Sequence, residues 1–328
     1  MYKNRYLDIN NSQQWIHFNR HTDSQPLLLI VDGGFYQPEI HRLIHNQLKN
    51  IFGLTVVTWD QRGLGNSTNA VNDWTEIKIE DYTSDLISLV HQLLTHFHKN
   101  KIFLLSHCFG SIPSLLAVSQ NPEYFHAYFS VSQVVNPLEN IFASYKKILN
   151  LPSAQGNFSP IQELQKHDIL SGASGSERKI RHNAKMAYRM DPTARSLSAP
   201  GVIGKLLQCT TNPFQIWKYR SGTYKRRRSL HSELMKINFS ETIRELSLPV
   251  YFLVGRQDIL SPPELAENYF RKLKAPHKTF IWFEKSGHFP FLQEPDKFNN
   301  VLKKEMALPQ DIAGEKDPSV WNMVMSLC

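Results

Sequence analysis

The sequence lacks the features that mark membrane-spanning, secreted and zinc-binding proteins. No run approaches the roughly 18 uninterrupted apolar residues of a membrane span, and the first residues show no apolar stretch or cleavage site of a signal peptide. The three cysteines, Cys108, Cys209 and Cys328, form no C-x-x-C pair, which argues against a disulfide framework or a structural zinc site. We therefore expect a cytoplasmic protein with reduced thiols, no membrane span, no metal and no cofactor.

Acidic residues are scarce in one part of the chain. The 328 residues together carry a net charge of +8. Residues 176–228 hold 13 lysines and arginines against 2 acidic residues, a net charge of +11, so the rest of the chain carries −3. Because the basic character belongs to a single segment, we do not expect a nucleic-acid partner.

Short apolar runs alternate with segments of helical period. This alternation predicts an α/β protein with a mostly parallel sheet flanked by helices on both faces. Two amphipathic segments before residue 20 predict an antiparallel edge. The predicted strands of the parallel part are residues 25–32, 53–60, 101–106, 124–132, 249–255 and 278–284.

The rhythm of strands and helices breaks between residues 136 and 245. Helical segments such as 140–149, 177–190 and 233–246 are separated there by clusters of Pro, Gly and Ser. We interpret this part as a helical cap inserted between two strands of the sheet. The expected domains are a core of residues 1–135 and 246–308, a cap of residues 136–245, and a tail of residues 309–328.

Reactive side chains follow several of the predicted strands. The loops at the carboxyl ends of parallel strands converge on one crevice, so these side chains can meet there. In "SHCFGS", Ser106 and Gly110 permit a tight strand-to-helix turn that aims Cys108 into the crevice, where the positive end of the helix dipole favours a thiolate. Asp258 and His288 follow the last two strands, in the chain order nucleophile, acid, histidine that is typical of α/β-hydrolases.

Five loops together resemble those of the proline iminopeptidase-like α/β-hydrolases. "DQRGLGNS" matches the signature loop of that family, "SHCFGS" its Gly-x-Ser-Trp-Gly-Ser elbow, and "GRQDILSPPE" and "SGHFPFLQEP" its acid and histidine loops. "DGGF" stands where the family has His-Gly-Gly-Pro. The resemblance covers the chain apart from the tail, and it implies an α/β-hydrolase fold with an inserted helical cap.

The resemblance and the chemistry of the residues agree on a catalytic triad of Cys108, Asp258 and His288. His288 would accept the thiol proton or hold the ion pair, and Asp258 would fix its tautomer. The backbone N–H groups of Phe109 and Gly34 would form an oxyanion hole, in which each donor is typically worth about 3 kcal/mol. For each residue taken alone, the alternative is a structural role, such as a buried thiol or a helix cap.

Three residues beside this triad are candidates for substrate contact. They are Phe35, Arg62 and His107, which follow strands at the same edge of the sheet. For Arg62 a structural role is favoured, through an ion pair with Asp60 or a bond to a carbonyl.

Three departures from the family pattern bear on the substrate. Cys108 replaces a serine, Asp32 replaces the histidine that opens the oxyanion motif, and Phe109 replaces a tryptophan. Because a thiolate is a good leaving group, attack by Cys108 favours thioesters, activated esters and lactones over amides. We therefore expect a hydrolase or acyltransferase of the thioesterase type, which acts on a small-molecule acyl substrate through an S-acyl enzyme.

The charge of the cap bears on the same question. In the resembled peptidases, carboxylates of the insertion hold the free amino group of the substrate, and this insertion does contain Glu163, Glu233 and Glu241. Its +11 segment would nevertheless repel an ammonium group and attract an anion. An acidic acyl-carrier protein or coenzyme A fits that segment as the acyl donor, and a solvated helix face is the alternative.

Two further functions stay open. One is a proline iminopeptidase-like aminopeptidase or amidase, which the resemblance supports. The other is a non-catalytic binding protein on a hydrolase scaffold, since folds are reused for unrelated functions.

Overall fold

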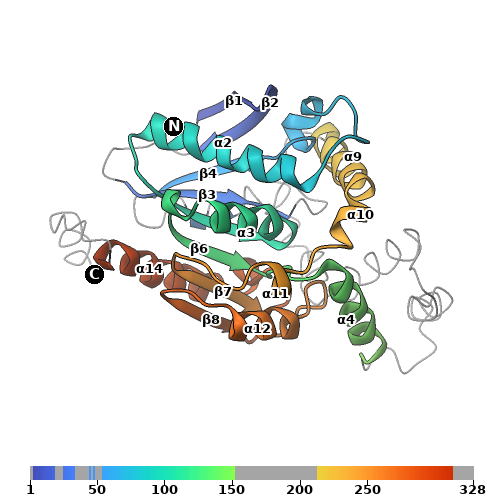
Figure 1. The fold of residues 1–328 in the computed structure, drawn as a ribbon, viewed down its shortest axis with the longest axis vertical. Helices are drawn as coiled ribbons and strands as arrows, with labels where there is room; N and C mark the ends of the chain where they lie inside the picture. The colour runs from blue at the N-terminus through green and yellow to red at the C-terminus, as the bar shows by residue number, and fades with distance from the viewer. Residues whose placement is uncertain are drawn as a thin grey trace.

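An eight-stranded sheet forms the centre of the protein (Figure 1). The computed structural model describes residues 3–18, 25–33, 44–45, 47–48, 54–151 and 213–312. The strands lie in the order β1-β2-β4-β3-β5-β6-β7-β8. Their bounds are β1 (Lys3–Ile9), β2 (Ser12–Phe18), β3 (Leu27–Val31), β4 (Thr55–Asp60), β5 (Ile102–His107), β6 (Phe125–Val131), β7 (Val250–Gly255) and β8 (Lys278–Phe283).

The pairing of the strands confirms the predicted α/β architecture. Strands β3 to β8 run parallel to one another, whereas β1 and β2 pair antiparallel with each other and β2 pairs antiparallel with β4. All six predicted strands of the parallel part and the antiparallel edge are present. The six parallel strands therefore end at one edge of the sheet, where their loops can meet.

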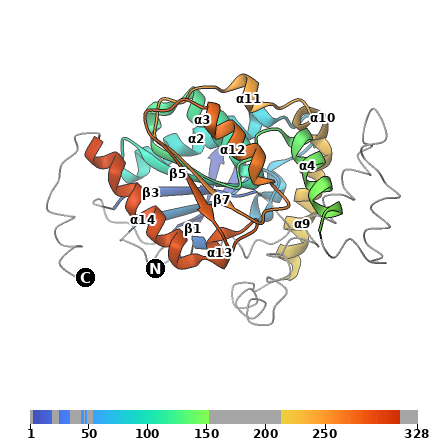
Figure 2. The same cartoon turned by 90° about the horizontal axis from the view of Figure 1, so that it is seen from below.

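Helices cover both faces of the sheet. Figures 1 and 2 show α2 (Ile79–Phe97), α3 (Ser111–Gln120) and α12 (Pro263–Lys272) on one face and α14 (Pro295–Ile312) on the other. Helix α2 forms because Leu86, Leu89, Val90 and Leu93 recur at helical spacing, and all four are buried against the sheet. The shorter helices are η1 (Gly65–Ala70), η2 (Cys108–Gly110), η3 (Pro122–Tyr124), α10 (His231–Leu234), α11 (Phe239–Thr242) and α13 (Pro290–Gln293).

The core has two parts, one on each face of the sheet. Successive side chains of a strand point to opposite faces. Leu29 therefore belongs to the cluster under α2 and α3, and its neighbour Leu28 belongs to the cluster under α14. Because both faces are covered, every residue of β3, β5 and β7 is buried. The central strands thus form a rigid support for the loops that follow them.

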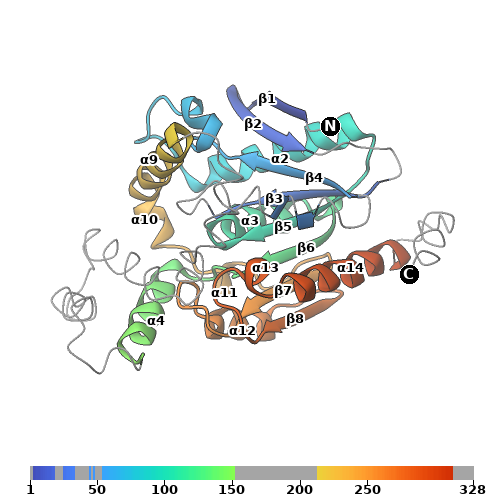
Figure 3. The same cartoon turned by 180° about the vertical axis from the view of Figure 1, so that it is seen from behind.

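Three helices lie beyond the carboxyl ends of the strands, as Figure 3 shows from behind. They are α4 (Pro137–Leu149), α9 (Pro213–Ser229) and α10, and all belong to the segment predicted as a cap. The helix predicted at 177–190 falls outside the described residues. The single helix predicted at 233–246 is wrong, because it is divided into α10 and α11, and the N–H of Phe239 bonds instead to the carbonyl of Val135.

Candidate active site

The thiol of Cys108 lies at a strained turn between β5 and α3. Cys108 has a φ of 52°, a left-handed conformation that an L-residue adopts at a cost in energy. Its neighbours hold the turn: the hydroxyl of Ser111 donates to the Cys108 carbonyl at 2.6 Å, and a Cβ on Gly110 would lie 2.3 Å from the carbonyl oxygen of Val31. This backbone has the conformation of a nucleophile elbow, which presents a side chain at the end of a sheet. Cys108 is 5% exposed.

Asp258 and His288 form a buried pair at the ends of β7 and β8. The ring nitrogen Nδ1 of His288 lies 2.9 Å from Oδ2 and 3.1 Å from Oδ1 of Asp258. The backbone N–H of Ser261 donates to Oδ1 at 2.8 Å and orients the carboxylate. The two loops approach so closely that a Cβ on Gly255 would lie 1.9 Å from the carbonyl oxygen of Gly287. With Nδ1 directed at Asp258, Nε2 is the ring nitrogen left for the substrate side.

The charges around His288 favour its protonated form. Burial alone would lower the pKa of His288, but the charges of Asp258 and Cys108 and their hydrogen bonds raise the pKa well above its usual value. An imidazolium at His288 is therefore compatible with neutral pH. Its partners are the Asp258 carboxylate on one side and the sulfur of Cys108 on the other.

The loop after β3 lies directly against the elbow. A Cβ on Gly33 would be 2.7 Å from Cβ of Cys108 and 3.3 Å from the backbone nitrogen of Phe109, so only glycine fits there. This approach brings Gly33 beside the backbone N–H of Phe109, which lies in η2 just before α3 begins at Ser111. Gly34 and Phe35, which we expected as an oxyanion donor and a substrate contact, lie outside the described residues.

His107 is buried against the backbone of His288, and its contacts favour a supporting role over the expected substrate contact. Its Nε2 donates to the carbonyl of His288 at 3.0 Å, and the hydroxyl of Ser132 donates to the same carbonyl at 3.3 Å. Nδ1 of His107 lies 3.6 Å from Oδ1 of Asp32. Burial lowers the pKa of His107 and keeps the ring neutral. His107 therefore supports the backbone of His288.

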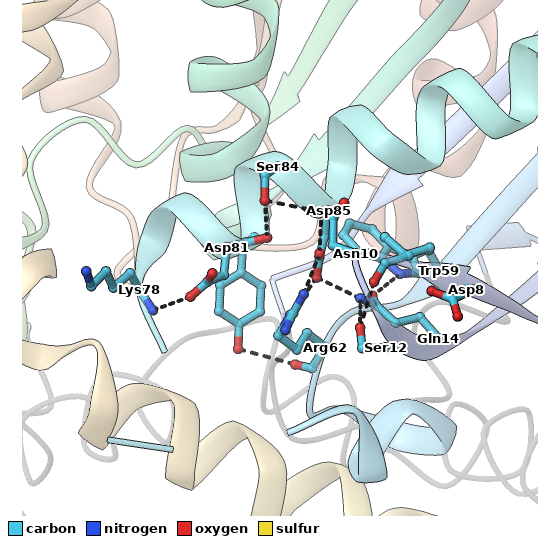
Figure 4. Close-up of polar contacts among 12 residues, drawn as sticks. Asp8, Asn10, Ser12, Gln14, Trp59, Arg62, Lys78, Asp81, Ser84 and Asp85 are labelled. Atoms are coloured by element: carbon cyan, nitrogen blue, oxygen red, sulfur yellow. Dashed lines mark hydrogen bonds and ion pairs between the residues drawn. The ribbon is translucent and has the colours of Figure 1, made fainter. Parts of the chain in front are cut away.

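Arg62 likewise has a structural position. Its Nε and Nη2 donate to the two carboxylate oxygens of Asp85 at 2.7 and 2.6 Å (Figure 4), so the expected partner Asp60 is wrong. Asp85 is fully buried on α2 and also accepts from the side chains of Asn10 at 2.9 Å and Gln14 at 2.7 Å. This bidentate pair ties the "DQRG" loop to α2 and fixes the orientation of the guanidinium, which supports the structural role expected for Arg62.

The stability of this loop is expected to depend on Asp85. The Asp85→Ala variant leaves the part-buried guanidinium and the Gln14 amide without their acceptor, and we expect the free energy of unfolding to fall by about 3 kcal/mol. Urea unfolding measures this difference. The matched control is Glu80→Ala on the exposed side of α2, for which we expect a change within about 0.5 kcal/mol. A loss below about 1 kcal/mol for Asp85→Ala would contradict the role of the pair.

Arg226 belongs to the site, although its sequence context pointed to the surface. In "KRRR", Arg226 is 1% exposed, whereas Lys225 and Arg228 are exposed and Arg227 is half-buried. The guanidinium of Arg226 lies 4.0 Å from the ring centre of Phe109, and its Nη2 donates to the carbonyl of Gly33 at 2.9 Å.

A helical spacing in the sequence could have indicated that position. Gly222 and Arg226 lie four residues apart on the buried face of α9, and the buried Leu230, which directly follows the helix, continues this spacing. A Cβ on Gly222 would lie 2.1 Å from the carbonyl oxygen of Gly63, so α9 packs directly on the loop after β4.

Within the described part of the chain, no group of three or more His, Cys, Asp or Glu side chains is arranged to hold a metal ion. Of the helices that the structure describes, none has the length and apolar character needed to cross a membrane.

Comparison of the sequence with known proteins identifies relatives over most of its length. The family model described as alpha/beta hydrolase fold matches residues 26–295. The probable aminopeptidase YbaC of Bacillus subtilis strain 168 is 31% identical over 314 residues, which are 91% of this chain and 94% of the relative.

Solved structures with the same fold cover nearly the whole chain. VinJ has a TM-score of 0.66 at 14% identity, covering 93% of this chain and 98% of VinJ. A proline iminopeptidase-related protein from Thermus thermophilus has a TM-score of 0.64 at 18% identity, covering 94% of this chain and 98% of that protein. At these identities the likeness concerns the fold.

Proposed function

Because the chain belongs to the alpha/beta hydrolase fold family, we propose that it is a hydrolase or acyltransferase with a catalytic triad of Cys108, His288 and Asp258. The observation that carries the proposal is the joint geometry: a thiol at a strained elbow, and a buried histidine whose Nδ1 lies 2.9 Å from a buried carboxylate. Each residue has a common structural role when taken alone. The three together have the relation of nucleophile, base and orienting acid.

The first half of the reaction is acylation of the thiol. The Cys108 sulfur, paired with the His288 imidazolium, attacks the acyl carbonyl, and the carbonyl electron pair moves to its oxygen. The N–H of Phe109 donates to this oxyanion, together with the donor expected at Gly34. When the tetrahedral intermediate collapses, the bond to the leaving group breaks, and His288 gives its proton to the departing thiolate or alkoxide. An S-acyl enzyme remains.

The second half releases the acyl group. His288, now neutral, accepts a proton from water, and the resulting hydroxide attacks the thioester carbonyl. Collapse of the second intermediate expels the Cys108 thiolate and restores the ion pair with His288. An alcohol or amine that replaces water at this step makes the same enzyme an acyltransferase.

The cysteine favours substrates with good leaving groups. In a tetrahedral intermediate on sulfur, the Cys108 thiolate competes with the leaving group of the substrate for expulsion. A thiolate or an activated alkoxide leaves readily, whereas an amide nitrogen must first be protonated. The proposed substrates are therefore acyl thioesters, activated esters or lactones. Delivery of the acyl group by an acidic carrier protein or coenzyme A stays a prediction, to which the exposed Lys225 and Arg228 contribute positive charge.

A covalent acyl adduct tests the proposal. The full-length protein is mixed with a panel of short acyl thioesters, and its intact mass is measured within seconds. We expect a mass increase equal to one acyl group, located on Cys108 by peptide mapping and absent in Cys108→Ala. The control variants are Cys209→Ser and Cys328→Ser, which should retain the adduct. Its absence from the wild-type protein under all conditions, without turnover, would favour the non-catalytic alternative.

An aminopeptidase is the second candidate, and the similarity to YbaC favours it. The same protein incubated with aminoacyl anilides separates the two proposals, because anilide cleavage requires attack on an amide. We expect thioester hydrolysis to exceed anilide hydrolysis in kcat/KM by at least about a hundredfold, in line with the leaving-group argument. Equal or faster cleavage of anilides would replace the first candidate by the second.

A further inference from the structure

We propose that Arg226, a residue of the cap segment, is a positioning residue that activates the oxyanion hole of the core. The proposal rests on the proposed function, because it assigns Arg226 to the step in which negative charge appears on the acyl oxygen. Arg226 would help to stabilise the negative charge on the acyl oxygen of the tetrahedral intermediate. A residue of the cap segment would thereby contribute to a step that takes place in the core.

The contacts of Arg226 lie on both sides of the elbow. Its guanidinium is stacked 4.0 Å from the ring centre of Phe109, whose backbone N–H is the expected oxyanion donor. Nη2 donates to the carbonyl of Gly33 at 2.9 Å, and Nη1 donates to Oε1 of Gln61 at 3.2 Å. The Nε2 of Gln61 in turn donates to the carbonyl of Asp32 at 2.6 Å. One side chain from α9 therefore contacts both the elbow and the loop after β3.

The bond to Gly33 has an electronic consequence. A carbonyl and the N–H of the following residue belong to one peptide group, so a cation at the oxygen withdraws electron density from that N–H. Hydrogen bonds in series strengthen one another in this way, and a charged donor has the larger effect. The peptide group of Gly33 contains the N–H of Gly34, the second expected donor. Through the bond to the Gly33 carbonyl, Arg226 would polarise this expected donor, and it fixes the Gly33 backbone beside Cys108.

The position of Arg226 is itself well determined. Helix α9 cannot move inward, because the Gly222 backbone already lies against the carbonyl of Gly63. The guanidinium carbon of Arg226 also lies over the ring of Tyr82, 5.7 Å from the ring centre, and Tyr82 packs edge-on against Phe109 with ring centres 6.0 Å apart. A buried guanidinium between two rings and two carbonyl-containing groups holds one orientation.

Two reactions of the Cys108 thiol distinguish activation of the oxyanion hole by Arg226 from a merely structural role of Arg226. Alkylation of Cys108 by iodoacetamide needs the thiolate but no oxyanion hole, whereas acylation by a thioester needs both. In Arg226→Met we expect the acylation rate to fall by about ten- to a hundredfold, somewhat less than after loss of a direct donor. Alkylation should stay within about twofold and KM within about threefold. The Arg226→Lys variant keeps the charge and should recover part of the acylation rate.

The matched control is Arg271→Met, the same exchange at an exposed arginine of α12, which should change neither rate. Parallel loss of acylation and alkylation in Arg226→Met would overturn the inference in favour of a merely structural role. Unchanged acylation would overturn it as well. If the wild-type protein forms no acyl adduct, the proposed function fails and takes this inference with it. If wild type and Arg226→Met acylate equally fast, the proposed function survives and only the role of Arg226 is lost.

Discussion

The Cys108→Ala variant is expected to lose the covalent adduct completely and to lose turnover by roughly 10⁴-fold or more. In enzymes with a nucleophile, base and acid, removal of the nucleophile abolishes the covalent route and leaves the residual effect of binding and the oxyanion hole. Initial rates on the best thioester of the panel measure the loss. The exchange removes one sulfur from a position that is 5% exposed, so the fold should persist, and circular dichroism checks this.

A second thiol variant gives this prediction its control. Cys108→Ser keeps a nucleophilic oxygen at the elbow and should stay well below wild type, because the imidazolium-favouring surroundings of His288 suit a thiolate rather than a neutral hydroxyl. Turnover of Cys108→Ala within tenfold of wild type would exclude Cys108 as the nucleophile. In that event the elbow would have to serve another group.

The second large effect is expected for Asp258→Asn, with kcat/KM reduced by about 10³ to 10⁴. Asparagine keeps the shape of the side chain and its acceptor for the Ser261 N–H, but it removes the negative charge beside His288. Burial, which lowers the pKa of His288, then has less to oppose it, so that pKa falls. The ion pair with Cys108 exists only at pH values below the pKa of His288. A lower pKa therefore removes the pair at neutral and alkaline pH.

The pH dependence of alkylation shows this directly. In the wild-type protein the iodoacetamide rate should already be high at neutral pH. In Asp258→Asn the rate at neutral pH should fall by about tenfold or more, because a neutral His288 no longer favours the thiolate. Identical profiles for the two proteins would mean that Asp258 does not act on His288 electrostatically. The control is Glu284→Gln, which removes one negative charge from an exposed ion pair with Arg256. This variant should keep the wild-type profile.

The strands and the meeting of Asp258 with His288 could be predicted from the sequence because their signals are local. Buried parallel strands appear in the sequence as apolar runs, and the candidate reactive residues lie in the loops that follow these runs. Examples are Cys108 after β5 and His288 after β8. The order of these loops along the chain was sufficient to expect that they meet. Their meeting depends on the parallel sheet, which a single sequence does indicate.

The partners of Arg62, His107 and Arg226 could not be predicted in the same way, because each partner lies far away in the sequence. Arg62 pairs with Asp85 on α2, and His107 contacts the backbone of a residue 181 positions later. A carbonyl acceptor leaves no trace in the sequence, since every residue has one. For Arg226 the sequence was misleading, because its three basic neighbours indicated a solvated helix face. The spacing of four residues between Gly222 and Arg226, which indicates a shared buried face, was therefore not recognised.

The division of the triad between the two halves of the chain has a consequence for synthesis and quality control. Cys108 stands at the end of β5, but Asp258 and His288 become available only when β7 has joined β6, through pairs such as Tyr128 with Val250, and β8 has followed. A partly folded chain therefore displays an ordinary cysteine. Under the proposed function, catalytic competence would arise with the last strand, so a thiol-reactive acyl probe would report the fraction of molecules that have completed their sheet.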